Sequence, residues 1–208
     1  MLNIWSTLSP YFTAKFRNED PTLLLIYTLY AYPIAIGSMT VSMQLGALLF
    51  GKIDMRLQLF IGTVIYCAAL FLSQYMETYT SFLFVFAVMG GFGFGIIFFL
   101  PIGCVWSFFP LHKPYVAGAV LSWCALSSCY YYYMTPMILN PTGEKPQIII
   151  PTVVGTDRYF APDSPQVQAL PELLSYFSLV AFAIMCTGIP FIKFNYKAAA
   201  KKKNATYS

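Results

Sequence analysis

The sequence predicts an all-α integral membrane protein with about five transmembrane helices. Three features predict this class: 58% of the 208 residues are hydrophobic, only 10% are charged, and the charges leave long stretches without any. A soluble domain carries about 25% charged residues, so this chain could not cover a water-facing surface. The uncharged stretches extend over residues 21–51, 57–76, 78–111, 114–143 and 173–192. Each has about the 20 residues that a helix needs to cross the hydrocarbon layer.

The transmembrane helices are expected at residues 23–50, 57–76, 80–108, 114–138 and 172–192. The first and third are longer than a straight crossing requires, and Pro33 and Pro101 are the expected bends. Pro136 and Pro141 should end the fourth helix near the membrane surface. The chain is thereby divided into an N-terminal segment 1–22, a four-helix membrane region 23–139, a long loop 140–171, a fifth helix 172–192 and a tail 193–208.

Lysine and arginine near the ends of the expected helices indicate the orientation of the chain. Eight fall on one side, namely Lys52, Arg56, Lys113, Lys193, Lys197, Lys201, Lys202 and Lys203. Four fall on the other side, namely Lys15, Arg17, Lys145 and Arg158. This excess places the tail in the cytoplasm, or in the matrix of a mitochondrion, and places segment 1–22 on the outer face. That segment lacks the apolar core of a secretory signal, and Pro10 should interrupt any helix within it.

The sequence leaves two alternatives for the membrane in which the protein resides. The first residues carry hydroxyl groups, Lys15 and Arg17 before any acidic residue, which resembles a mitochondrial address. The mitochondrial inner membrane is one expected location, and another cellular membrane is the alternative. Four tail residues are candidate contacts for anionic lipids, cardiolipin included, because juxtamembrane lysines attract such headgroups: Lys197, Lys201, Lys202 and Lys203. Alternatively, these lysines only set the orientation of the chain.

Small residues four positions apart are expected to mark helix-packing faces. Such residues let a second backbone approach closely, which favours helix association in lipid. The candidates are Ser38, Ser42 and Gly46, then Gly91 and Gly95, then Gly118 and Ser122. The glycine run at 90–95 resembles a phosphate loop at first sight. It does not fit the dinucleotide fingerprint, and no Gly-Lys-Ser/Thr follows it. A phosphate at bilayer depth would also need partners for its charge, so the glycines indicate packing.

Two further stretches are candidate contact surfaces. Tyr130–Tyr133 lie near the outer end of the fourth helix, where tyrosines form an interfacial belt or contact a partner chain. The loop 140–171 contains five prolines between residues 140 and 170, and long loops of this kind are usually functional or interaction segments. Its apolar stretch QIIIPTVV is expected either to lie extended on the surface or to add to a partner's sheet. Ser164 and Pro165 predict the start of a helix.

No cofactor or metal site is expected. The five cysteines lie within the expected helices and match no zinc or haem spacing, so they should be packing residues: Cys67, Cys104, Cys124, Cys129 and Cys186. The chain has one histidine, His112, and offers no paired carboxylate or nucleophile–base order. We therefore expect that the protein is not an enzyme. Nucleic-acid binding is also not expected, because most of the positive charge lies in the tail.

Two loops carry a resemblance to a transporter family. GKIDMR at 51–56 resembles the loop between helices 2 and 3 of major facilitator superfamily transporters, with Gly51, Asp54 and Arg56 matching. WSFFPLHKPYVAGAV at 106–120 resembles the link between helices 4 and 5 of the oxalate/formate-antiporter-like branch. The matching residues there are Trp106, Phe109, Pro110, Lys113, Ala117 and Gly118. Met55 separates the acid from the base in the first motif, and Pro114 replaces a family glycine in the second.

The resemblance covers residues 5–139, with the last helix in the place of helix 6, and implies helices 2–6 of the N-terminal half of such a transporter. These transporters rock two six-helix halves about a midplane site, yet the resemblance leaves helix 1 and the second half unmatched. No acid or base lies inside any expected helix. The resemblance therefore implies a non-catalytic, transporter-derived accessory or scaffold subunit of a large membrane complex, whose partners are other membrane subunits. A mitochondrial respiratory-chain complex is the expected example, because such complexes gather many small membrane subunits.

The alternative is a half-sized membrane carrier of a neutral or monocarboxylate solute. Its uncharged pathway would be lined by Ser38, Ser42, Gln44, Ser122, Ser127 and Ser128.

Overall fold

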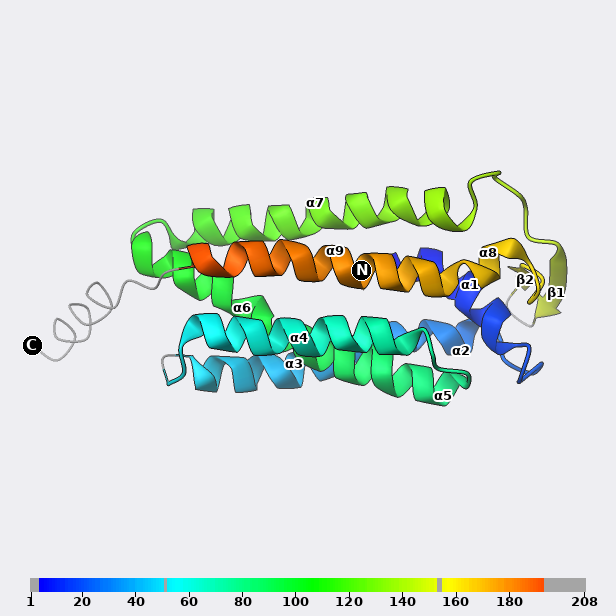
Figure 1. Ribbon diagram of the computed structural model, residues 1–208, viewed down its shortest axis with the longest axis horizontal. Coiled ribbons are helices and arrows are strands. Elements are labelled where there is room, and N and C mark those ends of the chain that lie inside the picture. The colour runs from blue at the N-terminus through cyan, green and yellow to red at the C-terminus, as the bar shows by residue number, and fades with distance from the viewer. Residues whose placement is uncertain (1–3, 51, 153–154, 193–208) are drawn as a thin grey trace, which may run out of the picture.

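The computed structural model describes residues 4–50, 52–152 and 155–192. The chain is mostly helical, and its long helices run side by side along one axis (Figure 1). Four helical segments are long and apolar enough to cross a membrane: Leu25–Leu49, Met55–Ser73, Tyr79–Phe108 and Pro165–Phe191. The prediction of a helical integral membrane protein is confirmed, with four such segments in the described residues rather than five.

The difference lies in α7 (Lys113–Leu139), the fourth expected helix. It has 27 residues and runs along the bundle, but it is not among the four apolar segments. The four consecutive tyrosines at 130–133 and the serines at 122, 127 and 128 lower its hydropathy. The helix continues past Pro136 and ends at Leu139, one residue beyond the expected end at 138.

The first segment consists of α2 (Leu25–Leu29) and α3 (Ala31–Leu49), separated at Tyr30. Pro33 explains this interruption, because it has no N–H to donate to the carbonyl of Leu29 four residues earlier. The third segment consists of α5 (Tyr79–Phe82), a π-helical stretch (Leu83–Met89) and α6 (Gly90–Phe108). Its irregular part is the π-helical stretch, and α6 continues through Pro101 without a break.

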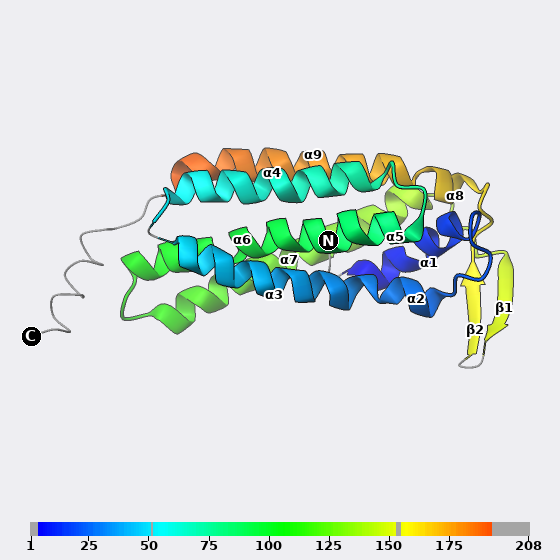
Figure 2. The ribbon, with the colours of Figure 1, turned by 90° about the horizontal axis from the view of Figure 1, so that it is seen from below.

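Helix α6 lies between α3 and α4 (Met55–Ser73), and glycines make both contacts close (Figure 2). Residues 91 and 95 share one helical face, whereas residue 93 points to the opposite face. A β-carbon on Gly91 would lie 2.5 Å from the carbonyl oxygen of Ala35 in α3. A β-carbon on Gly93 would lie 2.6 Å from the backbone nitrogen of Tyr66 in α4. The alternating glycines therefore let two helices approach α6 from opposite sides.

The N-terminal segment contains α1 (Trp5–Phe16), although Pro10 was expected to prevent a helix there. That prediction is wrong. Pro10 cannot donate to the carbonyl of Ser6, and the hydroxyl of Ser9 donates to this carbonyl instead, at 3.2 Å. Helix α1 lies in one half of the bundle, the right half in Figures 1 and 2.

The long loop forms an antiparallel hairpin of β1 (Ile148–Thr152) and β2 (Gly155–Tyr159), with Ile148 opposite Tyr159. The apolar stretch therefore pairs with the next segment of its own chain. The hairpin lies at the same end of the bundle as α1. As predicted, Pro165 then opens a helix, α8 (Pro165–Gln168), with Ser164 as its N-cap.

The last helix, α9 (Leu170–Gly188), continues into a 3₁₀ turn (Ile189–Phe191). It packs on α4, where the hydroxyl of Ser178 donates to the carbonyl of Cys67 at 2.9 Å.

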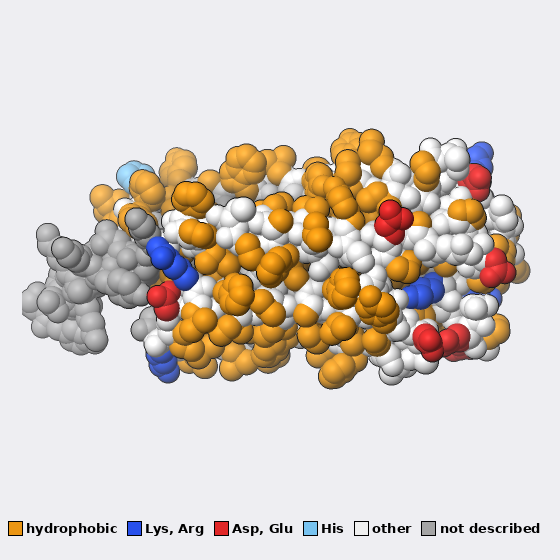
Figure 3. Space-filling model, in the orientation of Figure 1, with side chains coloured by type: hydrophobic (Ala, Val, Ile, Leu, Met, Phe, Trp, Pro, Cys, Tyr) orange, Lys and Arg blue, Asp and Glu red, His pale blue; other side chains and the backbone are white. Residues whose placement is uncertain are grey.

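Charged side chains gather toward the two ends of the molecule, and hydrophobic side chains cover the part between them (Figure 3). Arg56 lies at the start of α4 and Lys113 at the start of α7, whereas Lys15 lies near the end of α1. This distribution fits a bilayer around the middle of the bundle, where a charged side chain would be costly.

Candidate functional site

A cavity of about 520 Å³ lies between α7 and the rest of the bundle, with lining residues from α3, α4, α6, α7 and α9. Ligand pockets typically have about 300–1,000 Å³, so the space is large enough for a small molecule. Its lining is mainly apolar, for example Ile36, Phe94, Phe98 and Met185. No acidic or basic residue lines it.

The cavity exists because α7 is held at its ends and stands away from the bundle between them. At its start, the indole N–H of Trp106 donates to the carbonyl of Lys113 at 3.0 Å. Near its other end, the ring of Tyr131 contacts that of Phe177 with 4.8 Å between centroids. Of the 27 residues of α7, only Thr135 and Leu139 are buried, and both belong to its last two turns. The middle of α7 therefore leaves a space beside α3 and α6.

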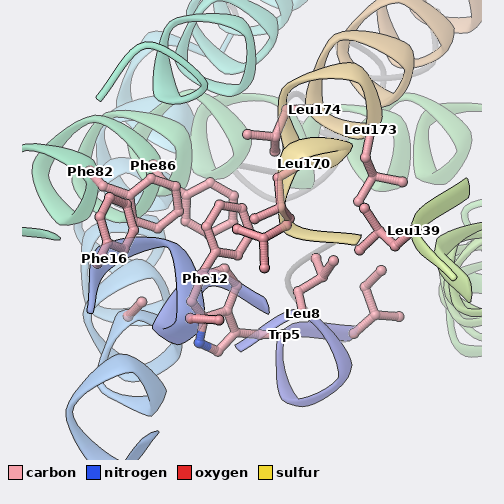
Figure 4. Packing of buried hydrophobic residues seen from close by; sticks show 14 of the residues in the cluster. Trp5, Leu8, Phe12, Phe16, Phe82, Phe86, Leu139, Leu170, Leu173 and Leu174 are labelled. Carbon is pink, nitrogen blue, oxygen red and sulfur yellow. The ribbon is translucent and has the colours of Figure 1, made fainter. Parts of the chain in front are cut away.

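A dense aromatic cluster closes the bundle on the α1 side of the cavity (Figure 4). Trp5 and Phe12 of α1 contact Phe82 and Phe86, with centroid distances of 4.9 Å for Trp5–Phe86 and 4.7 Å for Phe12–Phe82. Tyr66 and Tyr131 line the cavity and also pack against this cluster. Leucines of α1, α7 and α9 complete the packing: Leu8, Leu139, Leu170, Leu173 and Leu174.

Hydrogen bonds fix α1 in this position. The indole N–H of Trp5 donates to the carbonyl of Thr28 at 2.9 Å, in a buried setting. The hydroxyls of Thr13 and Thr28 lie 2.7 Å apart, and that of Thr13 also reaches the carbonyl of Ser9 at 2.7 Å. These polar groups are thus satisfied inside the core, and α1 is joined to α2 by more than apolar contact. Sequence analysis missed this helix, although Trp5, Leu8, Phe12 and Phe16 recur at helical spacing.

Charged residues lie around the closed end of the bundle, which is the end that the aromatic cluster of α1 fills. The ammonium of Lys15 donates to the carbonyl of Gln74 at 3.1 Å, and burial lowers the pKa of Lys15 against the opposing effect of Glu19 and Glu77. The guanidinium of Arg17 lies 5.0 Å from the ring centroid of Tyr159. These contacts join the end of α1 to α4 and to the hairpin.

The phenol of Tyr159 joins the hairpin to α2. It donates to Asp157 at 2.7 Å and accepts from the backbone N–H of Leu25 at 3.1 Å. Burial, and next the hydrogen bond to Asp157, raise the pKa of Tyr159.

The polar groups of the cavity are hydroxyls. The hydroxyl of Ser127 donates to the carbonyl of Cys124 at 2.7 Å, and Ser128 also lines the space. The phenol oxygens of Tyr66 and Tyr131 make no hydrogen bond with any described residue. An uncharged apolar wall with free phenols can accept a neutral molecule but offers no counter-charge to an ion.

The expected helix-packing residues fall into two groups. Ser42 and Gly46 are buried between α3 and α6, and the hydroxyl of Ser38 donates to the carbonyl of Val88 at 2.6 Å. Gly91 and Gly95 face α3, as described for Gly91 above. Gly118 and Ser122 differ, because both are exposed and a β-carbon on Gly118 would meet nothing within 4 Å. The expected packing of another helix on this pair is therefore not found within the described chain.

Only part of the expected solute pathway lines the cavity. Of its six residues, Ser127 and Ser128 do so. Ser38 serves the contact of α3 with the π-helical stretch and Ser42 the contact of α3 with α6, whereas Gln44 and Ser122 are exposed.

The residues of the two transporter-like motifs have local structural roles. Asp54 caps α4 by accepting from the N–H of Arg56 at 2.8 Å, and the Arg56 side chain donates to the carbonyl of Ile192 at 3.0 Å. Lys113 places its ammonium 5.6 Å from the ring centroid of Trp106, while Phe109 and Pro110 are exposed. Gly51 and the tail residues Lys197, Lys201, Lys202 and Lys203 lie outside the described residues.

Residues 4–50, 52–152 and 155–192 contain no group of histidine, cysteine and carboxylate side chains that could hold a metal ion. All five cysteines are free thiols. No protein-family model, curated protein or solved structure matches this chain.

Proposed function

We propose that the chain is a non-catalytic subunit of a larger membrane-protein assembly, and that neighbouring subunits pack on its α7 side. The observation that carries this proposal is the scarcity of packing along α7, which buries only two of its 27 residues. Helices associate in membranes by close packing and by hydrogen bonds between side chains. The exposed residues of α7 include Trp123, Tyr132 and Tyr133, and such aromatic residues are enriched at protein contacts.

The closed end supports a fixed scaffold more than a moving carrier. A carrier that alternates its access must open each end of its pathway in turn. Opening the α1 end would expose Trp5, Phe12 and Phe16, all of them buried. Exposing one such side chain costs about 1.5–3 kcal/mol, so this opening would be unfavourable.

The proposal includes an origin and a location. The motifs at 51–56 and 106–120 support descent from one half of a major facilitator transporter. The mitochondrial inner membrane, a respiratory-chain complex and binding of anionic lipid by the tail lysines belong to the proposal as its expected setting.

Site-specific photo-cross-linking in the native cells tests the partner surface. A photoreactive residue replaces Trp123 on α7, and the matched control replaces Leu48 on α3; these side chains are 73% and 63% exposed. We expect position 123 to cross-link to one defined membrane protein several times more often than position 48. Gentle extraction should then yield a particle much larger than the 23.4 kDa chain. Recovery only as a monomer, or equal cross-linking at both positions, would refute the proposal.

A carrier of a small neutral or monocarboxylate solute is the second candidate, and the cavity with Ser127 and Ser128 favours it. Uptake of labelled monocarboxylates into vesicles containing the purified chain tests this function. Uptake that Ala125→Phe abolishes would support the carrier, because Ala125 lines the cavity. Vesicles that take up no more than protein-free controls would eliminate it.

A further inference from the structure

We propose that the cavity beside α7 binds a neutral, membrane-soluble molecule with a long apolar body and one hydrogen-bonding oxygen, of the class of long-chain alcohols. The proposal is independent of the scaffold function, because it concerns the isolated chain. It depends on the depth of the cavity, on its walls and on two phenols.

The depth of the cavity determines how a ligand reaches it. Its lining includes Tyr66 in Met55–Ser73, Phe94 in Tyr79–Phe108 and Ala181 in Pro165–Phe191. Each of these residues lies near the middle of its membrane-spanning segment. The cavity is therefore surrounded by hydrocarbon, and a ligand that already dissolves in the bilayer has the shortest path to it. The middle of α7, which has no buried residue, flanks this path.

The walls determine the body of the ligand. Phe94, Ile97 and Phe98 of α6 face Leu121 and Ala125 of α7 across the cavity, and none of these side chains carries a polar atom. Apolar surface of this kind favours a hydrocarbon body. No lining residue is charged, and a charged ligand at this depth would lack a counter-charge. The ligand is therefore neutral.

The phenols determine the polar group. Tyr66 and Tyr131 both line the cavity, yet within the described part of the chain neither phenol oxygen has a hydrogen-bond partner. Both side chains are half-buried and border the cavity, where hydrocarbon offers no water to pair with a hydroxyl, so a partner for these oxygens would be favourable. A hydroxyl or carbonyl oxygen on the ligand would pair with them. This distinguishes a specific ligand from an ordinary lipid tail, which has no oxygen along its chain.

The test uses the purified full chain in phosphatidylcholine nanodiscs and two photoreactive probes, hexadecanol and hexadecane, each with a diazirine and an alkyne. Mass spectrometry compares labelling of the peptide that carries Phe94 and Phe98 with labelling of exposed α3 residues. We expect hexadecanol to label the cavity peptide about threefold to tenfold more than hexadecane does, which is the factor that one net hydrogen bond provides.

Two pairs of variants complete the test. Ala125→Phe, which fills the cavity, should reduce cavity labelling at least about fivefold, whereas Ala119→Phe, on an exposed part of α7 outside the cavity, should not. Replacing Tyr66 and Tyr131 by Phe should abolish the preference for hexadecanol while hexadecane labelling stays unchanged. The same changes at the exposed Tyr132 and Tyr133 should have no effect. Equal labelling by both probes in the unmodified chain would overturn the proposal. Equal labelling of the cavity peptide in Ala125→Phe and Ala119→Phe would also overturn it.

Discussion

Gly95 of α6 lies directly against Ser42 of α3, so closely that a β-carbon on Gly95 would overlap the Ser42 hydroxyl oxygen. The same β-carbon would also come too close to the carbonyl oxygen of Met39. Ser42 is fully buried, and its hydroxyl donates to that carbonyl at 3.0 Å. The two helices can approach to this distance only because position 95 has no side chain. The contact therefore fixes the relative position of α3 and α6 in the bundle.

Gly95→Ala should destabilise the protein. Since the added methyl would meet backbone as well as a side chain, a change of rotamer cannot relieve the overlap. Overpacking of this kind costs about 1–3 kcal/mol, which should appear as a lower thermal unfolding midpoint in detergent. Gly118→Ala is the matched control, because its β-carbon would meet nothing within 4 Å. Its midpoint should stay or rise slightly, since alanine favours a helix. Equal midpoints for the two variants would contradict the close contact.

The sequence predicted the parts of the fold that follow from local pattern. Uncharged stretches of about 20 residues marked the spanning segments, because charge at bilayer depth is costly. Small residues four apart marked the faces of α3 and α6 that meet, at Gly46 and Gly91 among others. The helix start after Ser164 followed from the preference of proline for the first helical position, since Pro165 opens the helix and the Ser164 side chain makes no capping hydrogen bond.

The parts that sequence did not predict depend on contacts between distant residues. A helix that faces lipid and a helix that faces protein have similar apolar residues, so the unpacked middle of α7 left no signal. The strand pairing of Ile148 with Tyr159 joins an apolar stretch to a polar one. Pro10 does not interrupt α1, because Ser9 satisfies the carbonyl that Pro10 leaves free, and the sequence does not show this contact. The candidate site is lined by residues of α3, α4, α6, α7 and α9, which are distant in the chain, so it could not be located from sequence.

Phe12→Ala should weaken the closed end of the bundle. Phe12 is fully buried between Trp5 and Phe82, with centroid distances of 5.3 Å and 4.7 Å. Truncation of a buried phenylalanine costs about 3–5 kcal/mol, which should lower the unfolding midpoint strongly. Phe84→Ala serves as the control, because this side chain is mostly exposed and its removal leaves no cavity. If both variants unfold at the same temperature, the aromatic cluster does not stabilise this end.

Lys15 should make stability depend on pH in the alkaline range. Burial lowers the pKa of Lys15 below its ordinary value of 10.5. At a pH between the lowered pKa of Lys15 in the folded chain and 10.5, the unfolded chain holds a proton at Lys15 that the folded chain has lost. The free energy of unfolding therefore rises with pH across this window and is constant below it. Lys15→Met removes this dependence while keeping an apolar stem.

Unfolding midpoints measured from neutral pH towards 10.5 check this expectation. The midpoint of the unmodified protein, relative to that of Lys15→Met, should increase as the pH rises. Lys145→Met, at an exposed position in the loop, controls for general effects of alkali on the protein. Parallel pH profiles for the unmodified protein and Lys15→Met would show that burial does not perturb Lys15.

Tyr159→Phe should loosen the contact between the hairpin and α2. The phenol oxygen accepts from the N–H of Leu25 at 3.1 Å, and removing it leaves this amide without that partner. The loss of one such bond costs about 1–3 kcal/mol, which corresponds to roughly tenfold to hundredfold faster hydrogen exchange at the Leu25 amide. The ring remains available to the Arg17 guanidinium, so the hairpin should stay folded. Tyr133→Phe removes an exposed phenol on α7 and should leave the exchange of Leu25 unchanged. Unchanged protection of Leu25 in Tyr159→Phe would mean that another group holds the hairpin against the bundle.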